Sequence, residues 1–381
     1  MKPINRVKKG AMTMPTICET LTHDLPYLKR YEVTIHEGDT QVCEGAIRFV
    51  YTRYGDDFIK TMTVSGVATP LEHRRHGYVR QLFDRFYQLA EENGAVVSLL
   101  HPFSFSYYRK FGYGKVADHL IARCPIRLID FVPRCCELVK YTGTEQQLQD
   151  LIHIYNTFSA NRQLMLRRFD NTYFAKYDTY IRYEDGQPVG YIAYTAQKTL
   201  YINHYEDGLL SVKELAYTSP SAMKALLGFI RMYEGELDDV EFANLAMCPE
   251  VERALQHYTH TRYQILPDIM ARILDTKKLL EAHRYPDQPG TFRIRITDTL
   301  PTVDGAFEVH YGGGSVQVER LADDAPVDMI ADAGEMARLL YGYDAVTARE
   351  AAYSDAITVC GNADDFFRAF PKAVGGMYEH F

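Results

Sequence analysis

Apolar and polar residues alternate in three runs near the start of the chain, a pattern typical of half-buried β-strands. The runs cover 31–36, 42–50 and 58–68. Turn signals separate them, at Gly38-Asp39 and Gly55-Asp56. Before the first run, residues 1 to about 30 are expected to form a short helix or loop. The pattern therefore predicts three antiparallel strands behind an irregular N-terminal segment.

A helical spacing follows directly after these strands. Apolar residues recur at i, i+3, i+4 and i+7 and would form one buried face, at Val79, Leu82, Phe83, Phe86 and Ala90. The predicted helix covers 77–93, and Asn93-Gly94 is a common pair at a helix C-terminus. The apolar run 95–100 then suits a buried parallel strand. A short helix is expected over 105–111.

Residues from about 130 to 275 partly repeat this order of elements. Leu148, Leu151, Ile152 and Tyr155 keep the helical spacing. Strands are expected at 180–183, 189–195 and 214–218, a helix near 221–232, and a closing element at 268–275. The turn at 218–222 contains neither arginine nor glycine, so nothing in it is suited to hold a pyrophosphate. Both a second copy of the first fold and an unrelated α/β domain fit this pattern.

The last part of the chain follows a linker at Pro286 to Pro289. It alternates strands with helices and ends in a helical part. Strands are expected at 292–296, 306–310 and 315–319, and helices at 335–340 and 363–370. Gly312 to Gly314 form a hairpin turn rather than a phosphate loop, because no helix follows them.

Length and composition narrow the class of protein. A chain of 381 residues is expected to form two or three domains, and a hydrophobic content of 46% is that of a globular protein. No apolar run approaches about 18 residues, so no membrane partner is expected. The formal net charge of −8 makes nucleic acid an improbable partner. Seven scattered cysteines without a Cys-x-x-Cys pair indicate the cytoplasm and no structural zinc.

The strongest candidate for a binding site is the turn between the third strand and the first long helix. Val64, Val67 and Ala68 suit a buried strand end, and Pro70 stops the strand because it has no N–H. Two arginines and a glycine then lead into the helix, whose free N–H groups favour an anion. A plain strand-turn-helix and a nucleotide site are the alternatives, although the spacing fits neither Gly-x-Gly-x-x-Gly nor a P-loop.

Two motifs carry a resemblance to a known family. Arg74-x-x-Gly77, placed after Gly66 to Thr69, resembles the acetyl-CoA pyrophosphate loop of the GNAT acetyltransferases, with Val79 where that family usually has glycine or alanine. Together with the stretch from His101 to Gly114, it looks like the Eis (enhanced intracellular survival) branch of that superfamily. Eis-like chains usually have a fuller helical region before the first strands.

The resemblance implies an α+β fold class and a division into three domains. Tandem GNAT acyl-CoA N-acyltransferase folds would be followed by a sterol-carrier-like α/β domain. The expected domains are a catalytic GNAT domain at 1–130, a second GNAT-like domain without a CoA loop at 131–283, and the sterol-carrier-like domain at 284–381, which would end in an active-site carboxylate.

The resemblance also assigns roles to individual residues. Tyr108 would protonate the sulfur of CoA, and the carboxylate of Phe381 would enter the active site. Tyr107 and Tyr113 are the local rivals for the first role. His73, His76 and His101 border the site and fit loop residues better than bases. Cofactor contacts are expected at Val67, Ala68, Thr69, Arg75, His76, Gly77, Tyr78, Val79, Arg80, Phe103 and Ser104.

The function implied by the resemblance is acetyl-CoA-dependent N-acetyl transfer by direct attack, with acetyl-CoA as co-substrate and no metal. The acceptor would be a small polycationic amine, with aminoglycosides as the suggested class. A protein-lysine N-acetyltransferase and a non-catalytic acyl-CoA-binding scaffold are the alternatives. The resemblance further implies a homohexamer.

Overall fold

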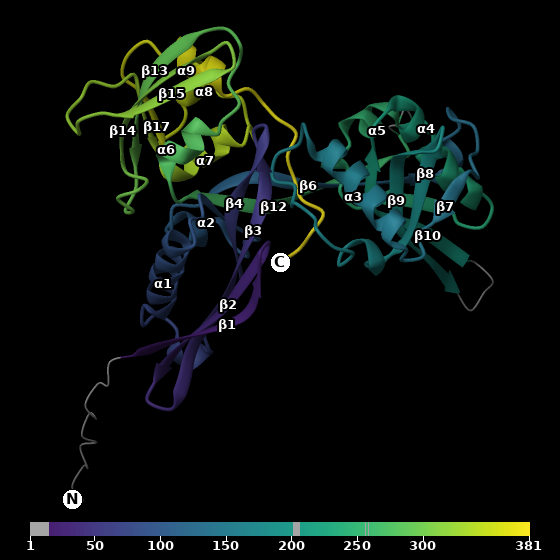
Figure 1. The fold of residues 1–381 in the computed structure, drawn as a ribbon, viewed down its shortest axis with the longest axis horizontal. Coiled ribbons are helices and arrows are strands. Elements are labelled where there is room, and N and C mark those ends of the chain that lie inside the picture. The colour runs from purple at the N-terminus through teal and green to yellow at the C-terminus, as the bar shows by residue number, and fades with distance from the viewer. Residues whose placement is uncertain (1–14, 201–205, 256, 258) are drawn as a thin grey trace, which may run out of the picture.

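The computed structural model describes residues 15–200, 206–255, 257 and 259–381. The chain folds into three bodies, and its C-terminal end lies between the first and the second (Figure 1). Each body is built around a cluster of buried apolar side chains. No helix in the described ranges is long and apolar enough to cross a membrane.

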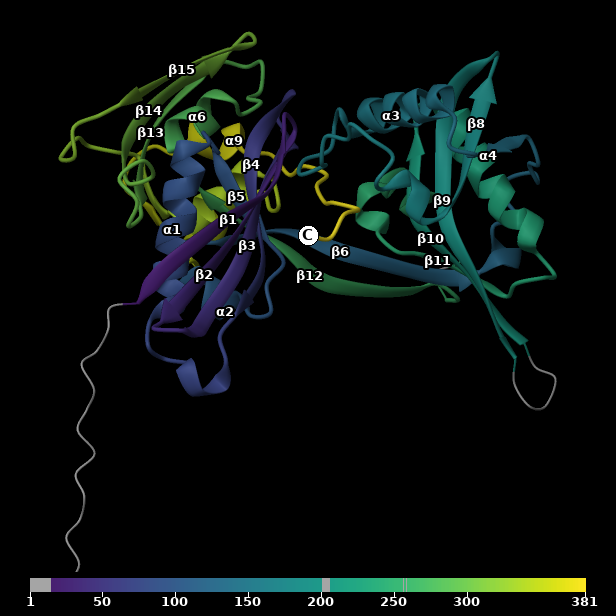
Figure 2. The same ribbon diagram turned by 60° about the horizontal axis from the view of Figure 1, so that its bottom comes forward.

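The first body is a strongly curved sheet with one long helix on its face (Figure 2). Its elements are β1 (Thr16–Leu25), β2 (Leu28–Glu37), β3 (Thr40–Tyr54), β4 (Asp57–Ala68), the 3₁₀ turn η1 (Leu71–His73), α1 (Tyr78–Glu92), β5 (Val97–Leu100), α2 (Phe105–Arg109) and β6 (Gly114–Pro125). β1 to β4 pair antiparallel in sequence order, and β4 pairs parallel with β5. The predicted strands and helices between 31 and 111 are therefore confirmed.

The N-terminal segment differs from the prediction of a helix or loop. Residues 16–25 form strand β1, which is exposed along its whole length and pairs with β2. Ile17, Leu21 and Leu25 are spaced by four residues, which imitates a helical stripe. The tight turn between Leu25 and Leu28 instead places the segment beside β2, so it forms a strand. Residues 1–14 lie outside the described residues.

The second body repeats the arrangement with its own buried cluster. Its elements are η2 (Ile126–Leu128), β7 (Leu138–Lys140), α3 (Glu145–Ser159), η3 (Phe174–Lys176), β8 (Asp178–Glu184), β9 (Gln187–Leu200), β10 (Glu206–Tyr217), α4 (Pro220–Ile230), η4 (Arg231–Tyr233), β11 (Asp239–Phe242), η5 (Leu245–Met247) and α5 (Pro249–Ala254). β10 pairs antiparallel with β9 and parallel with β11, as β4 does with β3 and β5.

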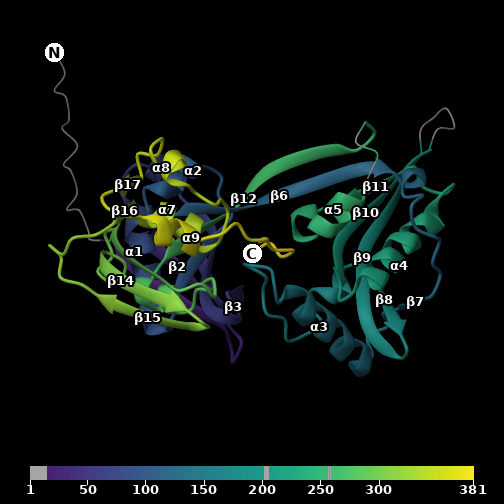
Figure 3. The same cartoon turned by 90° about the horizontal axis from the view of Figure 1, so that it is seen from above.

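One continuous sheet joins the first two bodies. Its strand order is β1-β2-β3-β4-β5-β12-β6-β11-β10-β9-β8-β7. Strand β12 (Arg262–Ile273) follows the second body in sequence but pairs antiparallel with β5 and β6. β6 and β12 run side by side from the first body to the second (Figure 3). The sheet of the first body is thus completed by a strand from far along the chain.

The third body is a five-stranded sheet packed with helices. It follows α6 (Thr276–Glu281) and consists of β13 (Gly290–Thr297), β14 (Gly305–Gly312), β15 (Ser315–Arg320), β16 (Met329–Asp332), α7 (Ala333–Leu340), α8 (Ala348–Ala351), β17 (Ile357–Val359) and α9 (Asp364–Ala369). The strand order is β15-β14-β13-β16-β17, and the predicted hairpin turn joins β14 to β15. Phe292, Ile294 and Ile296 point into the core, as the alternation predicts.

The first and third bodies share a core. One buried cluster contains Tyr54 and Leu99 of the first body together with Phe292 and Met336 of the third. At the contact, a Cβ atom on Gly114 would come within 1.7 Å of the carbonyl oxygen of Gly334. Glycine is therefore required there for β6 and α7 to approach.

Candidate active site

The turn between β4 and α1 has the form of an anion-binding loop. β4 bulges where Gly66 and Val67 lie opposite one residue of β3, and a bulge of this kind redirects the strand end. Gly77 is the N-cap of α1 and adopts a left-handed φ of 84° that favours glycine. No side chain caps α1. The first N–H groups of the helix are therefore free for a ligand.

This loop forms one wall of a cavity of about 790 Å³. α2 and the residues before it supply the opposite wall. The lining residues are Val67, Ala68, Thr69, His73, Arg74, Arg75, Gly77, Tyr78, Val79, Arg80, Phe103, Tyr107 and Phe111. The sequence placed Val67 and Ala68 in a buried strand end, but Ala68 is exposed and Val67 half-buried, because the bulge turns this end of β4 toward the cavity.

Most residues predicted to contact a cofactor are brought together at this cavity. His76 and Ser104 are not among its lining residues. The Nδ1 atom of His76 lies 3.0 Å from the carbonyl oxygen of His73. The Ser104 hydroxyl accepts a hydrogen bond from the backbone N–H of Tyr107 and so caps α2. Ser104 therefore stabilises the start of α2, which forms part of one wall, and does not itself line the cavity.

Tyr108 lies behind this wall. Its ring packs against the rings of Phe103 and Phe83, with centroids 5.4 Å and 6.3 Å away. No group within the described ranges forms a hydrogen bond to its hydroxyl. The rival Tyr113 is fully buried, and its hydroxyl lies 2.6 Å from Ser98 Oγ. Burial, with Tyr107 nearby, raises the pKa of Tyr108 to about 12, so the phenol keeps its proton at neutral pH.

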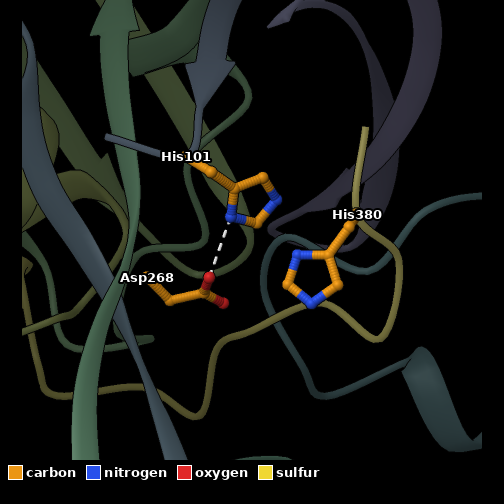
Figure 4. A group of neighbouring side chains, drawn as sticks. All are labelled: His101, Asp268 and His380. Carbon is orange, nitrogen blue, oxygen red and sulfur yellow. Dashed lines mark hydrogen bonds and ion pairs between the residues drawn. The ribbon is translucent and has the colours of Figure 1, made fainter. Parts of the chain in front are cut away.

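The C-terminal residues reach the first body at His101, which follows β5. The rings of His380 and Phe381 lie 4.8 Å and 4.6 Å from the His101 ring, centroid to centroid. On its other side, the Nδ1 atom of His101 lies 2.8 Å from Asp268 Oδ1 on β12 (Figure 4). His101 is thus held between a buried carboxylate and the end of the chain.

Asp268 is an anion at this point. Burial disfavours its charge, but the hydrogen bond to His101 and the nearby His119 outweigh burial and hold its pKa below the ordinary value. An ionised Asp268 orients His101 with a proton on Nδ1, which leaves Nε2 with a free lone pair. Nε2 is buried and has no hydrogen-bond partner among the described residues. A free lone pair held in one orientation suits a general base.

A buried ion network in the second body holds the segment that leads to the chain end. Arg168 donates hydrogen bonds to both oxygens of Glu214, at 2.8 Å and 2.7 Å, and from Nε to Glu379 Oε1 at 2.7 Å. The Arg168 side chain is 0% exposed. Tyr191 also donates to Glu214. A charged network of this kind fixes geometry, because desolvation cancels much of its energetic gain.

Hydrogen bonds to the second body hold the rest of this segment. The backbone N–H of Gln163 donates to Val374, and Asn244 Nδ2 donates to the carbonyl oxygen of Met377. The Tyr378 hydroxyl donates to the carbonyl oxygen of Leu215. Residues 374–379 therefore lie fixed along the second body, and only the final two residues project toward His101.

Sequence reasoning missed Asp268, His119, Arg168, Glu214 and Glu379. Asp268 is separated from His101 by 167 positions, and Arg168 from Glu379 by 211. No local spacing links such pairs. The one available signal was a charged residue inside an apolar strand pattern, as at Asp268 and Glu214.

Two regions of the sequence match known acetyltransferase domains. Residues 27–116 match the family model of an acetyltransferase (GNAT) domain, and residues 161–273 match a second, different acetyltransferase (GNAT) domain. The chain therefore contains two GNAT acetyltransferase domains, and by class it is an N-acetyltransferase. The second match excludes an unrelated α/β domain. No curated protein sequence matches the chain significantly.

Solved structures share the fold over nearly the whole chain. A GCN5-related N-acetyltransferase from Anabaena variabilis has a TM-score of 0.79 at 18% identity, covering 92% of this chain and 89% of that one. A conserved protein of unknown function from Enterococcus faecalis, a probable N-acyltransferase, has a TM-score of 0.75 at 17% identity, covering 97% and 100%. Eis1 from Mycobacterium abscessus has a TM-score of 0.75 at 16% identity, covering 92% and 91%. At these identities the likeness establishes the fold.

Proposed function

We propose that this enzyme transfers the acetyl group of acetyl-CoA to an amine of a small polycationic acceptor, of which aminoglycosides are the suggested class. The transfer is a direct attack without an acyl-enzyme. The observation that carries the proposal is the position of His101, whose ring is held by Asp268 on one side and meets Phe381 on the other. This arrangement places two proton acceptors, the His101 ring and the Phe381 carboxylate, at the first GNAT domain.

The cavity beside α1 fits CoA in its chemistry. Free N–H groups at the start of α1 and the guanidinium group of Arg75 suit the pyrophosphate, because both donate hydrogen bonds to phosphate oxygens. Arg75 forms no hydrogen bond or ion pair to another described residue, so its guanidinium remains available. Val67, Ala68 and Phe103 give the cavity an apolar wall suited to the pantetheine arm.

The proposed reaction forms a C–N bond and breaks the C–S bond of the thioester. The neutral amine attacks the carbonyl carbon, and the nitrogen loses one proton as the bond forms. His101 Nε2 accepts that proton directly or through water. An α-carboxylate is a weak base, with an ordinary pKa of about 3.5. We therefore assign the Phe381 carboxylate to binding the ammonium group and relaying its proton. Tyr108 gives its proton to the departing thiolate sulfur, and solvent restores both groups.

We also propose roles for the parts outside the cavity. The second GNAT domain, whose turn at 218–222 lacks arginine and glycine, serves as the anchor of residues 374–379. The third domain acts as a sterol-carrier-like scaffold. We further propose a homohexamer and a cytoplasmic location. Assembly of copies would cover apolar side chains left exposed on strands, such as Ile265, which is 65% exposed on β12. Sedimentation velocity of the full chain tests the assembly.

A screen of acetyl-CoA turnover across amines tests the function. The acceptors are aminoglycosides, linear polyamines and a lysine-containing peptide, and the readouts are release of the CoA thiol and the mass of the product. We expect acetylated aminoglycoside or polyamine. Turnover confined to the peptide would favour the protein-lysine enzyme. Tight acetyl-CoA binding without turnover of any acceptor would favour the scaffold.

A further inference from the structure

Three histidines converge on one buried carboxylate between the first and second bodies. His101 follows β5, His119 lies on β6, Asp268 lies on β12 and His380 is the penultimate residue. The chain has 13 histidines in all. Four separate segments must therefore come together to form this group, which we call the histidine cluster.

The distances within the histidine cluster are close to those of a metal site. One donor atom each from His101, Asp268 and His380 lies within 4.8 Å of the other two. Bonds from zinc to imidazole and carboxylate are about 2.0–2.2 Å, so two donors of a tetrahedral site lie about 3.4 Å apart. The most distant donors must therefore approach one another by up to about 1.4 Å. His380 is exposed near the chain end and is the donor best able to move.

Two buried atoms of the histidine cluster lack hydrogen-bond partners among the described residues. They are His101 Nε2 and Asp268 Oδ2. His119 Nδ1 lies 3.8 Å from Asp268 Oδ2, which is too long for a hydrogen bond. A buried polar atom without a partner is unfavourable, and two within one cluster of side chains fit a missing ligand. Both atoms are good donors to a cation.

We propose that His101, Asp268 and His380 form a reversible site for a divalent cation of the zinc class, with His119 as the nearest further donor. Two imidazoles and a carboxylate are a common donor set for such ions and leave one position open to water. No motif predicts this site, because its donors have no metal-binding spacing, and the proposal departs from the expectation that no metal binds.

Occupancy of the site inhibits acetyl transfer, a consequence that rests on the proposed function. A cation bound through Nε2 of His101 takes the lone pair that accepts the proton of the amine. It also places positive charge where a cationic acceptor must enter. The ion and the acceptor therefore exclude each other, and the enzyme is sensitive to free zinc.

Binding is tested with Co²⁺ as a spectroscopic probe. Full-length protein is treated with chelator, titrated with Co²⁺ while visible absorption is recorded, and then titrated with Zn²⁺ in a calorimeter. We expect one ion per chain, with intense absorption typical of a low-coordinate site. His380→Ala and Asp268→Asn should each weaken binding at least tenfold. His153→Ala, which removes an exposed histidine on α3, should bind like the wild type.

The outcomes separate this site from the proposed function. Equal Co²⁺ binding by the wild type, His380→Ala and Asp268→Asn would overturn the site, as would no binding at all. His380 lies at an exposed position, so its variant remains informative if Asp268→Asn does not fold. Cation binding by a protein that acetylates no amine supports the site and contradicts the function. Acetyl transfer unaffected by saturating Zn²⁺ overturns the inhibitory role.

Discussion

Arg168, in the core of the second GNAT domain, donates a hydrogen bond from Nε to Glu379, two residues before Phe381, over 2.7 Å. The contact links the second GNAT domain to the proposed active site in the first. Replacing such a pair with apolar residues often costs little stability, so its role is to fix position. We interpret Arg168 as a positioning residue for the end of the chain.

Glu379→Gln tests this positioning. The amide keeps the shape of the side chain but loses the charge that Arg168 holds, so Phe381 and His380 should lose their fixed position. A misplacement of about 1 Å can cost about 10²-fold in rate, so we expect kcat to fall tenfold or more. The KM for acetyl-CoA should stay unchanged. Glu281→Gln, at an exposed ion pair on α6, is the control. Equal kcat in the two variants would contradict this role.

Tyr108→Phe removes the proposed acid and keeps the ring. Turnover should fall about 10²-fold or more, the usual contribution of a positioned acid, while acetyl-CoA affinity changes little. The reaction should also show no alkaline decline from Tyr108 near the ordinary tyrosine pKa of about 10, because burial raises the pKa of Tyr108 to about 12. Tyr113→Phe removes a hydrogen bond to Ser98 and should mainly lower the thermal stability. If Tyr113→Phe loses turnover and Tyr108→Phe does not, the assignment of the acid is wrong.

Gly77→Asp tests the anion loop with a closely matched control. A Cβ atom at Gly77 meets nothing within 4 Å, so the new side chain has room, and only the left-handed φ of 84° resists it. Asparagine and aspartate both tolerate this region. Gly77→Asp should weaken acetyl-CoA binding by tenfold or more in calorimetry, since it adds an anion to an anion site. Gly77→Asn should weaken it far less, and equal losses would point to backbone strain instead.

Arg75→Ala removes a guanidinium group from the same loop. The loss of a charge-assisted phosphate contact is worth roughly 1.5–3 kcal/mol, or at least about tenfold in acetyl-CoA affinity. Arg349→Ala, on α8 of the third domain, should leave the affinity unchanged. Normal binding of acetyl-CoA by the Arg75→Ala protein would show that Arg75 does not contribute to cofactor binding.

Extending the chain beyond Phe381 tests its carboxylate. A C-terminal tag converts that carboxylate into an amide, and deletion of Phe381 moves the carboxylate back by about 3.5 Å. Both changes should nearly abolish turnover and spare most of the acetyl-CoA affinity, because the cavity lies beside α1. An N-terminal tag of equal length is the control. Native turnover with an uncleaved C-terminal tag would leave His101 as the proton acceptor without help from the chain end.

The contact between the first and third bodies should weaken in acid through His283. Its Nδ1 accepts a hydrogen bond from the Tyr54 hydroxyl and its Nε2 donates to the Ala369 carbonyl oxygen. Burial lowers the pKa of His283 to about 4. Between pH about 6.5 and 4 the unfolded chain binds a proton that the folded chain does not, so the free energy of unfolding falls as the pH falls through this window.

Thermal unfolding at pH 7.5 and pH 5 measures this effect. The loss of Tm between the two values should be smaller for His283→Gln than for the wild type, because the titrating group is gone. His153→Gln, at an exposed histidine, should lose as much Tm as the wild type. An equal loss in all three proteins would show that other groups govern the acid sensitivity.

The local parts of the fold and site could be predicted from the sequence. Helix α1 follows from the spacing of Leu82, Phe83 and Phe86, and its loop follows from the glycine and arginines before it. Strand β1 could not be predicted, because all its residues are exposed and no buried face imposes a period of two. The contacts of His101 with Asp268 and of Glu379 with Arg168 could not be predicted either. They form only once β12 and the chain end have packed in the folded protein.

The insertion of β12 between β5 and β6 has a consequence for how the protein is made. While the ribosome has delivered only the first 130 residues, β5 and β6 both present unpaired edges, and such edges invite pairing with other chains. The first GNAT domain must wait for residues 262–273 before its sheet can close. A fragment cut at the end of β6 should therefore aggregate rather than fold, and synthesis of the second GNAT domain sets the earliest moment at which the first can become a stable body.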